Sequence, residues 1–186
     1  MPDDDTTCTR VNPTRRMLLR ASLAGSVLAI APVSGVWAAN ERRVSLHNLH
    51  TGERINQPYW MAGDYLPQSL SAINSVLRDH RSGEVYPIDP GLLDLLSALQ
   101  QRLGSNEGYE VISGYRSPAS NAMLHKASDG VARRSLHMQG KAIDIRLPGT
   151  GLETLHEAAR QMKSGGVGLY AASNFIHVDT GRVRYW

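Results

Sequence analysis

Two histidines and an aspartate in two short strings of this sequence are residue types that can hold a catalytic metal ion. Residues 135–144 contain His137 and Asp144, and residues 176–179 contain His177. Structural zinc is usually enclosed by four protein ligands rich in cysteine, whereas catalytic zinc keeps three protein ligands and leaves a fourth position to water. The single cysteine of the chain lies far upstream. We therefore predict an open site for one zinc ion, held by His137, Asp144 and His177, and a hydrolytic reaction.

The pattern around these residues predicts the elements that hold them. Residues 141–147 alternate in the manner of a strand, so Asp144 is expected on a strand, with the first histidine in the loop just before it. Residues 175–179 carry β-branched and aromatic types and are expected to form another strand. Because side chains alternate across a strand, His177 and Asp179 should share one face, which places a second carboxylate beside the metal.

The remaining chain predicts an α+β domain. The clearest helix has Asp89 as its N-cap, Pro90 in the first turn and a leucine stripe that stops at Gly104. Helices cluster early and strands late, so we expect a small, mainly antiparallel sheet flanked by helices. The expected strands are residues 44–49, 53–59, 109–113, 141–147, 167–170 and 175–178, and the expected helices are residues 67–81, 90–103, 118–126 and 151–163.

Residues 1–38 have the order of an export signal. Paired arginines, Arg15 and Arg16, precede an apolar run over residues 21–33, and small residues around Ala38 suit cleavage. The run is too short to span a membrane, so no stable anchor is expected after cleavage. The arginine pair indicates the twin-arginine translocase, with general secretion as the alternative, and places the mature protein in the periplasm.

Composition excludes other classes of function. The chain has 20 Lys and Arg against 17 Asp and Glu, and removing residues 1–38 leaves 20 − 4 = 16 basic and 17 − 3 = 14 acidic residues. With this mild excess and no basic stripe interleaved with aromatics, we expect no nucleic-acid partner. The mature chain would carry no cysteine, so its metal ligands survive an oxidising compartment.

Three motifs in order resemble a known family. Ser135-x-His137-x-x-Gly140-x-Ala142-x-Asp144, preceded by residues 113–118 and followed by His177, resembles the D-Ala-D-Ala zinc peptidases, a family of cell-wall carboxypeptidases, dipeptidases and phage endolysins. The tail, residues 165–186, is most similar to a branch of exported murein endopeptidases. The likeness covers residues 39–186, which it identifies as a zinc peptidase domain with the hedgehog/D-Ala-D-Ala peptidase fold.

The resemblance implies a zinc endopeptidase that cuts peptide cross-links in peptidoglycan, with stem peptides as its partner. It assigns the metal to the same three ligands and turns Arg116 toward the substrate, where a guanidinium suits a stem-peptide carboxylate or a developing oxyanion. A surface arginine in a salt bridge is the alternative reading of Arg116. Tyr115 and Ser135 are the further substrate-binding candidates. Ser135 should also form hydrogen bonds within the metal loop, residues 135–140, which carries His137.

At the position of the catalytic base, which takes the proton of the attacking water, this sequence departs from the family. Dipeptidase and endolysin members place a glutamate three residues before the last histidine ligand, where this chain has Asn174. An asparagine cannot act as a base. Asp179 takes its place in one reading, as the catalytic base; in another it is a carboxylate that fixes the tautomer of His177.

Alternative functions keep the same residues. A D-alanyl-D-alanine carboxypeptidase, or a peptidoglycan-binding module that retains zinc without turnover, would share the motif. An iron oxygenase site of two histidines and one carboxylate fits less well, because no histidine follows His177. The other histidines, His47, His50, His80 and His156, are interpreted as surface or packing residues, and His125 as one that could face the cleft.

Overall fold

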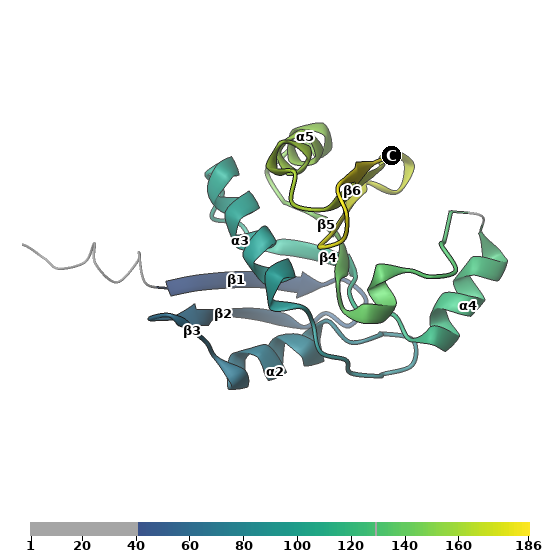
Figure 1. Ribbon diagram of the computed structural model, residues 1–186, viewed down its shortest axis with the longest axis horizontal. Helices are drawn as coiled ribbons and strands as arrows, with labels where there is room; N and C mark the ends of the chain where they lie inside the picture. The colour runs from purple at the N-terminus through teal and green to yellow at the C-terminus, as the bar shows by residue number, and fades with distance from the viewer. Residues whose placement is uncertain (1–40, 129) are drawn as a thin grey trace, which may run out of the picture. The chain divides into compact units, whose positions relative to one another are not determined.

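One sheet of eight strands organises residues 41–128 and 130–186, the part of the chain that the structure, a computed structural model, describes (Figure 1). The export signal expected for residues 1–38 lies outside the described residues. The strands are β1 (Glu41–Asn48), β2 (Arg54–Met61), β3 (Asp64–Tyr65), β4 (Tyr109–Ser113), β5 (Ala142–Arg146), β6 (Gly166–Tyr170), β7 (Phe175–Asp179) and β8 (Arg184–Tyr185). The helices are α2 (Pro67–Val76), α3 (Pro90–Leu103), α4 (Pro118–Ala127) and α5 (Leu152–Met162), with 3₁₀ turns η1 (Leu136–Gln139) and η2 (Ala171–Ser173).

The strand order is β3-β2-β1-β4-β5-β7-β6-β8, and the expected α+β class with a mainly antiparallel sheet is confirmed. Only the pairs β1–β4 and β6–β8 are parallel. The two edge strands, β3 and β8, were not expected, because two residues are too few to show an alternating pattern. Within the described residues, no helix has the length and apolar character needed to cross a membrane.

Helix α3 supplies the main apolar face that covers the sheet. Asp89 accepts a hydrogen bond from the Gly91 amide at 2.9 Å, and Gly104 ends the helix with a φ of 62°. The leucine stripe is buried, as expected, and α3 packs against β1 and α5 (Figure 1). Burying each leucine contributes roughly 1.5–3 kcal/mol, so this layer stabilises the central strands that carry the site.

The helix expected over residues 67–81 ends at Val76 instead, which corrects that prediction. The side chain of Asp79 accepts hydrogen bonds from the amides of Arg81 and Ser117, both at 2.9 Å, and so holds the chain in a turn. A short aspartate side chain that binds backbone amides competes with helix continuation. The turn also lets the Leu77 carbonyl accept from the Tyr115 amide at 2.8 Å, which ties α2 to the segment before α4.

Strands β5 and β7 are antiparallel neighbours near the centre of the sheet, and their register is what builds the site. Asp144 on β5 lies directly opposite His177 on β7. His137 lies on η1, a 3₁₀ turn where a plain loop was expected, and Gly140 ends that turn with a φ of 64°. A Cβ atom there would overlap the Pro87 carbonyl oxygen, so a glycine is required for η1 to close onto the neighbouring loop.

Candidate metal centre

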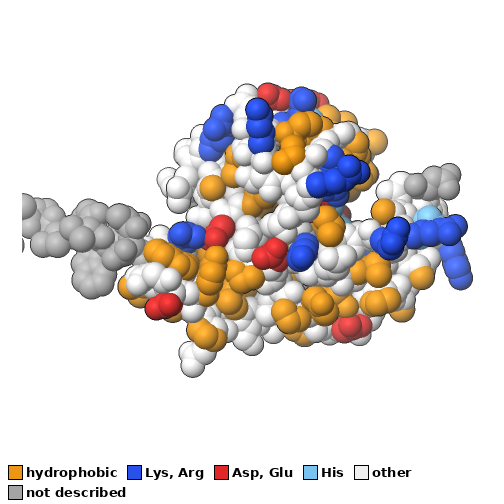
Figure 2. Space-filling view, viewed as in Figure 1, with side chains coloured by type: hydrophobic (Ala, Val, Ile, Leu, Met, Phe, Trp, Pro, Cys, Tyr) orange, Lys and Arg blue, Asp and Glu red, His pale blue; other side chains and the backbone are white. Residues whose placement is uncertain are grey.

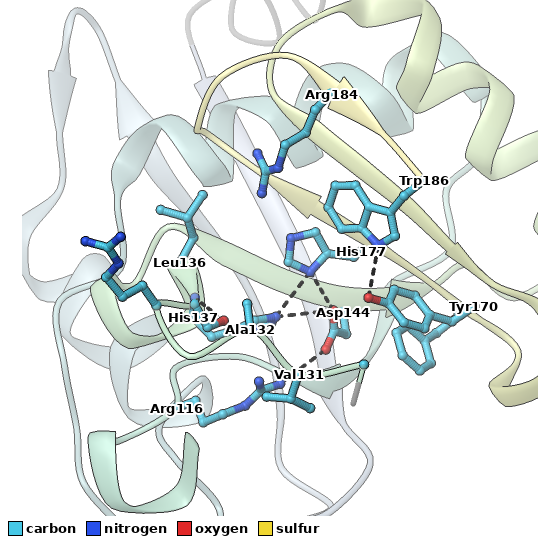
Figure 3. A pocket seen from close by; sticks show the side chains of 14 residues that line it. Arg116, Val131, Ala132, Leu136, His137, Asp144, Tyr170, His177, Arg184 and Trp186 are labelled. Carbon is cyan, nitrogen blue, oxygen red and sulfur yellow. Dashed lines mark hydrogen bonds and ion pairs between the residues drawn. The ribbon is translucent and has the colours of Figure 1, made fainter. Parts of the chain in front are cut away.

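Three ligand atoms from η1, β5 and β7 converge on one point (Figure 3). His177 Nδ1 lies 2.9 Å from Asp144 Oδ1 and 3.2 Å from His137 Nε2, and His137 Nε2 lies 3.3 Å from Asp144 Oδ1. All three residues are buried. Of the described residues, these three form the one group of histidine, cysteine and acidic side chains placed to hold a metal ion.

A backbone carbonyl fixes the orientation of His137. Its Nδ1 lies 2.7 Å from the Gly114 carbonyl oxygen, which can only accept a hydrogen bond. The proton of the neutral ring is therefore on Nδ1, and the lone pair of Nε2 faces the other two ligand atoms. Gly114 comes just after β4, so this contact links the motif around Arg116 to the metal loop.

A carboxylate fixes the orientation of His177 in the same way. Its Nε2 lies 3.0 Å from Asp179 Oδ2. Asp179 is fully buried and also accepts from the Gly166 and Gly181 amides at 3.0 and 2.8 Å and from the Arg184 guanidinium at 3.1 and 2.6 Å. Because the carboxylate is held as an acceptor, His177 carries its proton on Nε2 and turns the Nδ1 lone pair to the site.

The donor set fits a zinc ion. With both imidazoles neutral and in these tautomers, two nitrogen lone pairs and a carboxylate oxygen face one point, and a cation placed there stabilises the arrangement. Tetrahedral zinc with bonds of about 2.0–2.1 Å to nitrogen and oxygen would separate neighbouring ligand atoms by roughly 3.3–3.4 Å. The separations of 2.9, 3.2 and 3.3 Å are close to these values.

The acidic groups of the site are held in their charged forms. Burial alone would raise the pKa of Asp144, but His137 and His177 hold that pKa well below its usual range. The pKa of Asp179 is likewise low, because hydrogen bonds from His177, Arg184 and two amides outweigh its burial. Burial lowers the pKa of His177, yet the two carboxylates raise it on balance, which is the mark of a site that attracts positive charge.

Arg116 points into the site and is only loosely held (Figure 3). Its Nη2 lies 3.6 Å from Asp144 Oδ2 and 3.3 Å from Ser113 Oγ, its Nη1 lies 3.4 Å from Asn121 Oδ1, and its buried Nε has no partner among the described residues. Burial lowers its pKa from the usual value, and Asp144 opposes that shift. Arg116 is 9% exposed, which speaks against an ordinary surface salt bridge.

These side chains open into a cavity of about 360 Å³. Three arginines, Arg116, Arg134 and Arg184, line it, and among the described residues Asp144 is the one acidic residue of its lining. Figure 2 shows Lys and Arg side chains on both sides of a hollow between α4 and the C-terminal strands. The cavity is thus electropositive and suits an anionic ligand.

Of the two further substrate-binding candidates, Ser135 lies at the cavity and Tyr115 does not. Ser135 lines the cavity and accepts from the His137 amide at 3.3 Å, within the metal loop as expected. Tyr115 is absent from the lining. It is buried, stacks on Tyr86 with ring centroids 4.7 Å apart, and donates a hydrogen bond to Glu84 at 2.7 Å. Neighbouring side chains of an extended segment point to opposite sides, so the residue before Arg116 turns away.

An aromatic wall completes the cavity, and the sequence pattern did not reveal it. Tyr170 on β6 and Trp186 after β8 line the side next to His177 (Figure 3), and Phe175 on β7 lines the cavity stacked on Tyr170. Alternation along β7 would have placed Phe175 on the face of His177. The other two residues reach the site only through the pairing of β6 with β7 and β8, which short strands do not disclose. Asn174 lines a separate surface cavity.

The remaining histidines lie away from the three ligands, with His50 and His80 stacked at a centroid distance of 3.8 Å. His125 is absent from the cavity lining. Its Nδ1 lies 2.6 Å from the Val131 carbonyl oxygen, and its Nε2 accepts from Arg133 at 3.0 Å. It therefore braces a loop that lines the cavity.

Comparison with known proteins places the chain among peptidases. The family model described as peptidoglycan L,D-endopeptidase MepK matches residues 36–186. The chain is 39% identical over 175 residues to peptidoglycan L,D-endopeptidase MepK of Escherichia coli (strain K12), covering 92% of this chain and 96% of that protein. It is 40% identical over 166 residues to the probable peptidoglycan L,D-endopeptidase MepK of Haemophilus influenzae, covering 89% of each.

A solved structure, the L-Ala D-Glu endopeptidase ChiX of Serratia marcescens, is similar at 18% identity and a TM-score of 0.34 over 51% of this chain and 68% of that one. The protein is a peptidase. Its chain belongs to the peptidoglycan L,D-endopeptidase MepK family.

Proposed function

We propose that this chain is an exported, zinc-dependent endopeptidase that hydrolyses peptide cross-links in the peptidoglycan of the periplasm. The observation that carries the proposal is the convergence of His137 Nε2, Asp144 Oδ1 and His177 Nδ1 at separations of 2.9–3.3 Å, at the base of an electropositive cavity. Family membership supports the substrate, because the matched relatives carry the name of peptidoglycan L,D-endopeptidases.

The residues divide the work of hydrolysis among them. His137, Asp144 and His177 would hold the zinc ion, which when bound lowers the pKa of water and polarises a carbonyl group. The Gly114 carbonyl and the Asp179 carboxylate keep the two imidazoles in the tautomers that a metal needs. The reaction then requires no nucleophilic side chain, which agrees with Ser135 acting as a cap of η1.

Of the two roles open to Asp179, we propose positioning. Its oxygens lie on the Nε2 side of His177, whereas the ligand atom is Nδ1, and its remaining acceptor capacity is used by two amides and Arg184. A catalytic base must reach the proton that it removes. Asp179 is fully buried and outside the cavity lining, so a positioning role fits its contacts better.

Arg116 would act on the substrate. Its guanidinium is buried and points into the cavity, and its Nε–H has no partner among residues 41–128 and 130–186. A cation held in this way can stabilise negative charge that develops on the scissile carbonyl, or can bind a carboxylate of the stem peptide. Arg134, an exposed residue of the cavity lining, adds a second positive charge.

Analysis of digested peptidoglycan tests this function. Purified protein lacking residues 1–38 is incubated with cross-linked peptidoglycan, with and without a chelator, and the fragments are resolved. In the absence of the chelator, we expect cross-linked dimers to disappear with no release of D-alanine. In the presence of the chelator, we expect the dimers to remain. Released D-alanine would indicate a carboxypeptidase, and unchanged fragments with measurable wall binding would indicate a module without turnover.

Export through the twin-arginine translocase is a separate part of the proposal. It depends on Arg15 and Arg16 in front of the apolar run. The double substitution Arg15→Lys and Arg16→Lys should leave the precursor in the cytoplasm, as measured by cell fractionation. Normal export of this variant would instead support general secretion.

A further inference from the structure

The aromatic wall contains a hydrogen-bonded pair that points at the reacting side of the site. Trp186 Nε1 donates to the Tyr170 hydroxyl oxygen at 3.0 Å. The Tyr170 ring stacks on Phe175 with centroids 4.7 Å apart and an angle of 15° between planes. In Figure 3 the hydroxyl points from the ring toward the side of the cavity where His177 and Asp144 lie. Tyr170 therefore has a fixed ring and a fixed hydroxyl oxygen.

The position of Trp186 is itself fixed by backbone and packing. Its amide donates to the Val167 carbonyl at 3.3 Å, and its carbonyl accepts from the Leu169 amide at 2.9 Å. Its ring lies 5.3 Å from the His177 ring and over Gly168, where a Cβ atom would come within 2.6 Å of the indole nitrogen. The absence of a side chain at Gly168 is therefore what allows the indole to lie against β6 and reach the Tyr170 oxygen.

The direction of this hydrogen bond decides what Tyr170 can do. An indole nitrogen is a donor only, so the phenol oxygen is the acceptor and its proton is directed elsewhere. Among the described residues, no acceptor lies within hydrogen-bond distance of that proton. A hydroxyl that already accepts a hydrogen bond becomes a stronger donor, because the bonds in a chain polarise one another. The cavity thus contains an oriented donor that has no acceptor in the described part of the chain.

We propose that the Tyr170 hydroxyl is a catalytic hydrogen-bond donor to the oxyanion that forms at the scissile carbonyl, and that Trp186 is its positioning residue. The inference rests on the proposed peptidase function. Arg116 and Tyr170 approach the ligand cluster from different sides (Figure 3), so a tetrahedral oxyanion there is met by a guanidinium and by a neutral phenol. Donors aimed at the position of a developing charge stabilise the transition state more than the ground state.

Three substitutions test the Tyr170 hydroxyl and the Trp186 N–H separately, with a control. Tyr170→Phe removes the hydroxyl and keeps the stacking on Phe175. Trp186→Phe removes the indole N–H and keeps an aromatic ring. Tyr185→Phe is the matched control, because that hydroxyl donates to the Arg160 carbonyl at 3.1 Å on the protein surface and is absent from the cavity lining. Each variant is assayed as zinc-loaded protein on a soluble cross-linked peptide, and zinc content is measured in parallel.

The expected result is a fall in kcat of about a hundredfold for Tyr170→Phe, the size seen when one oxyanion donor is removed, with KM and zinc content near those of the wild type. Trp186→Phe should lower kcat by about tenfold, since the donor remains but is less well oriented, and Tyr185→Phe should leave kcat unchanged. A phosphinate analogue of the scissile peptide, which carries the tetrahedral anionic oxygens, should lose affinity for Tyr170→Phe in proportion to kcat.

The proposal is overturned by kcat of Tyr170→Phe within twofold of the wild type, by a change confined to KM, or by loss of zinc in step with activity. If Tyr170→Phe fails to fold, Trp186→Phe tests the proposal in its place. An unchanged kcat with an unchanged phosphinate affinity in Trp186→Phe overturns the proposal. A lowered kcat with retained zinc supports it. An inactive wild-type protein would instead contradict the peptidase function on which the inference rests.

Discussion

Asp144 and His177 face each other across two antiparallel strands, and this register pairing puts two of the three proposed ligand atoms 2.9 Å apart. His137 arrives from a separate element and is oriented by the Gly114 carbonyl. The types and order of these residues could be read from the sequence. The carbonyl that orients His137 could not, because a backbone acceptor leaves no residue signature. These contacts preorganise the site, because each of the two histidines is held by its own acceptor, the Gly114 carbonyl or the Asp179 carboxylate.

Removal of His137 should abolish metal retention. His137→Ala deletes one of the three proposed ligands, so the variant is expected to keep no zinc after dialysis, whereas the wild type is expected to retain about one ion per chain. Metal content is measured by atomic absorption alongside circular dichroism. His47→Ala serves as the control, because His47 lies outside the metal group. Full zinc occupancy in His137→Ala would contradict the assignment of the ligands.

Substitution of Asp179 distinguishes positioning from base catalysis. Asp179→Asn weakens the hydrogen bond that holds the His177 tautomer, so zinc affinity should fall about 10- to 100-fold, with activity largely restored at saturating zinc. Competition with a chromogenic chelator measures the affinity. A base would show the opposite pattern: unchanged zinc affinity with turnover lost at every zinc concentration.

Some of the helices and strands that hold the site could be predicted from the sequence, and others could not. Helix α3 and strands β5 and β7 were predictable because their apolar residues repeat over a full element. The end of α2 was not, because the Asp79 side chain binds amides of two separate segments and one of them, Ser117, is remote in sequence. Likewise, Tyr170 and Trp186 meet only after β6 has paired with β7 and β8.

Asp79 should be a stability determinant of the turn that anchors the Arg116 segment. Burial opposes its ionisation, but hydrogen bonds from Ser120, Ser117 and backbone amides hold its pKa well below the usual range. Asp79→Asn should lower the free energy of unfolding by about 1–3 kcal/mol at neutral pH, as measured by urea titration. Asp64→Asn, on an exposed strand, is the control and should have little effect.

The lowered pKa of Asp79 determines how the difference in unfolding free energy between the wild type and Asp79→Asn depends on pH. A carboxylate whose pKa is lower in the folded state stabilises the fold above its unfolded pKa, about 3.9. The gap between wild type and Asp79→Asn should therefore be constant above about pH 5 and should narrow as the pH falls below about 4. A gap that widens in acid would show that Asp79 does not act through its charge.

At the scale of the whole molecule, the sheet brings residues from β5, β6, β7, η1 and the segment before α4 to one electropositive cavity. The α+β class and the order of elements were predictable, because helical and alternating patterns occupy separate stretches of the chain. The charge of the cavity was not, since the mature chain is nearly neutral in composition and Arg116, Arg134 and Arg184 gather only in the folded structure.

Zinc titration of metal-free protein tests the central claim most directly. Protein lacking residues 1–38 is stripped with a chelator, and its activity on cross-linked peptidoglycan is followed as zinc is added back. The stripped protein should be inactive, and activity should rise with zinc and level off at one equivalent, with His137→Ala inactive throughout. Activity in the stripped protein equal to that of the zinc-loaded protein would contradict a metal-dependent peptidase at His137, Asp144 and His177.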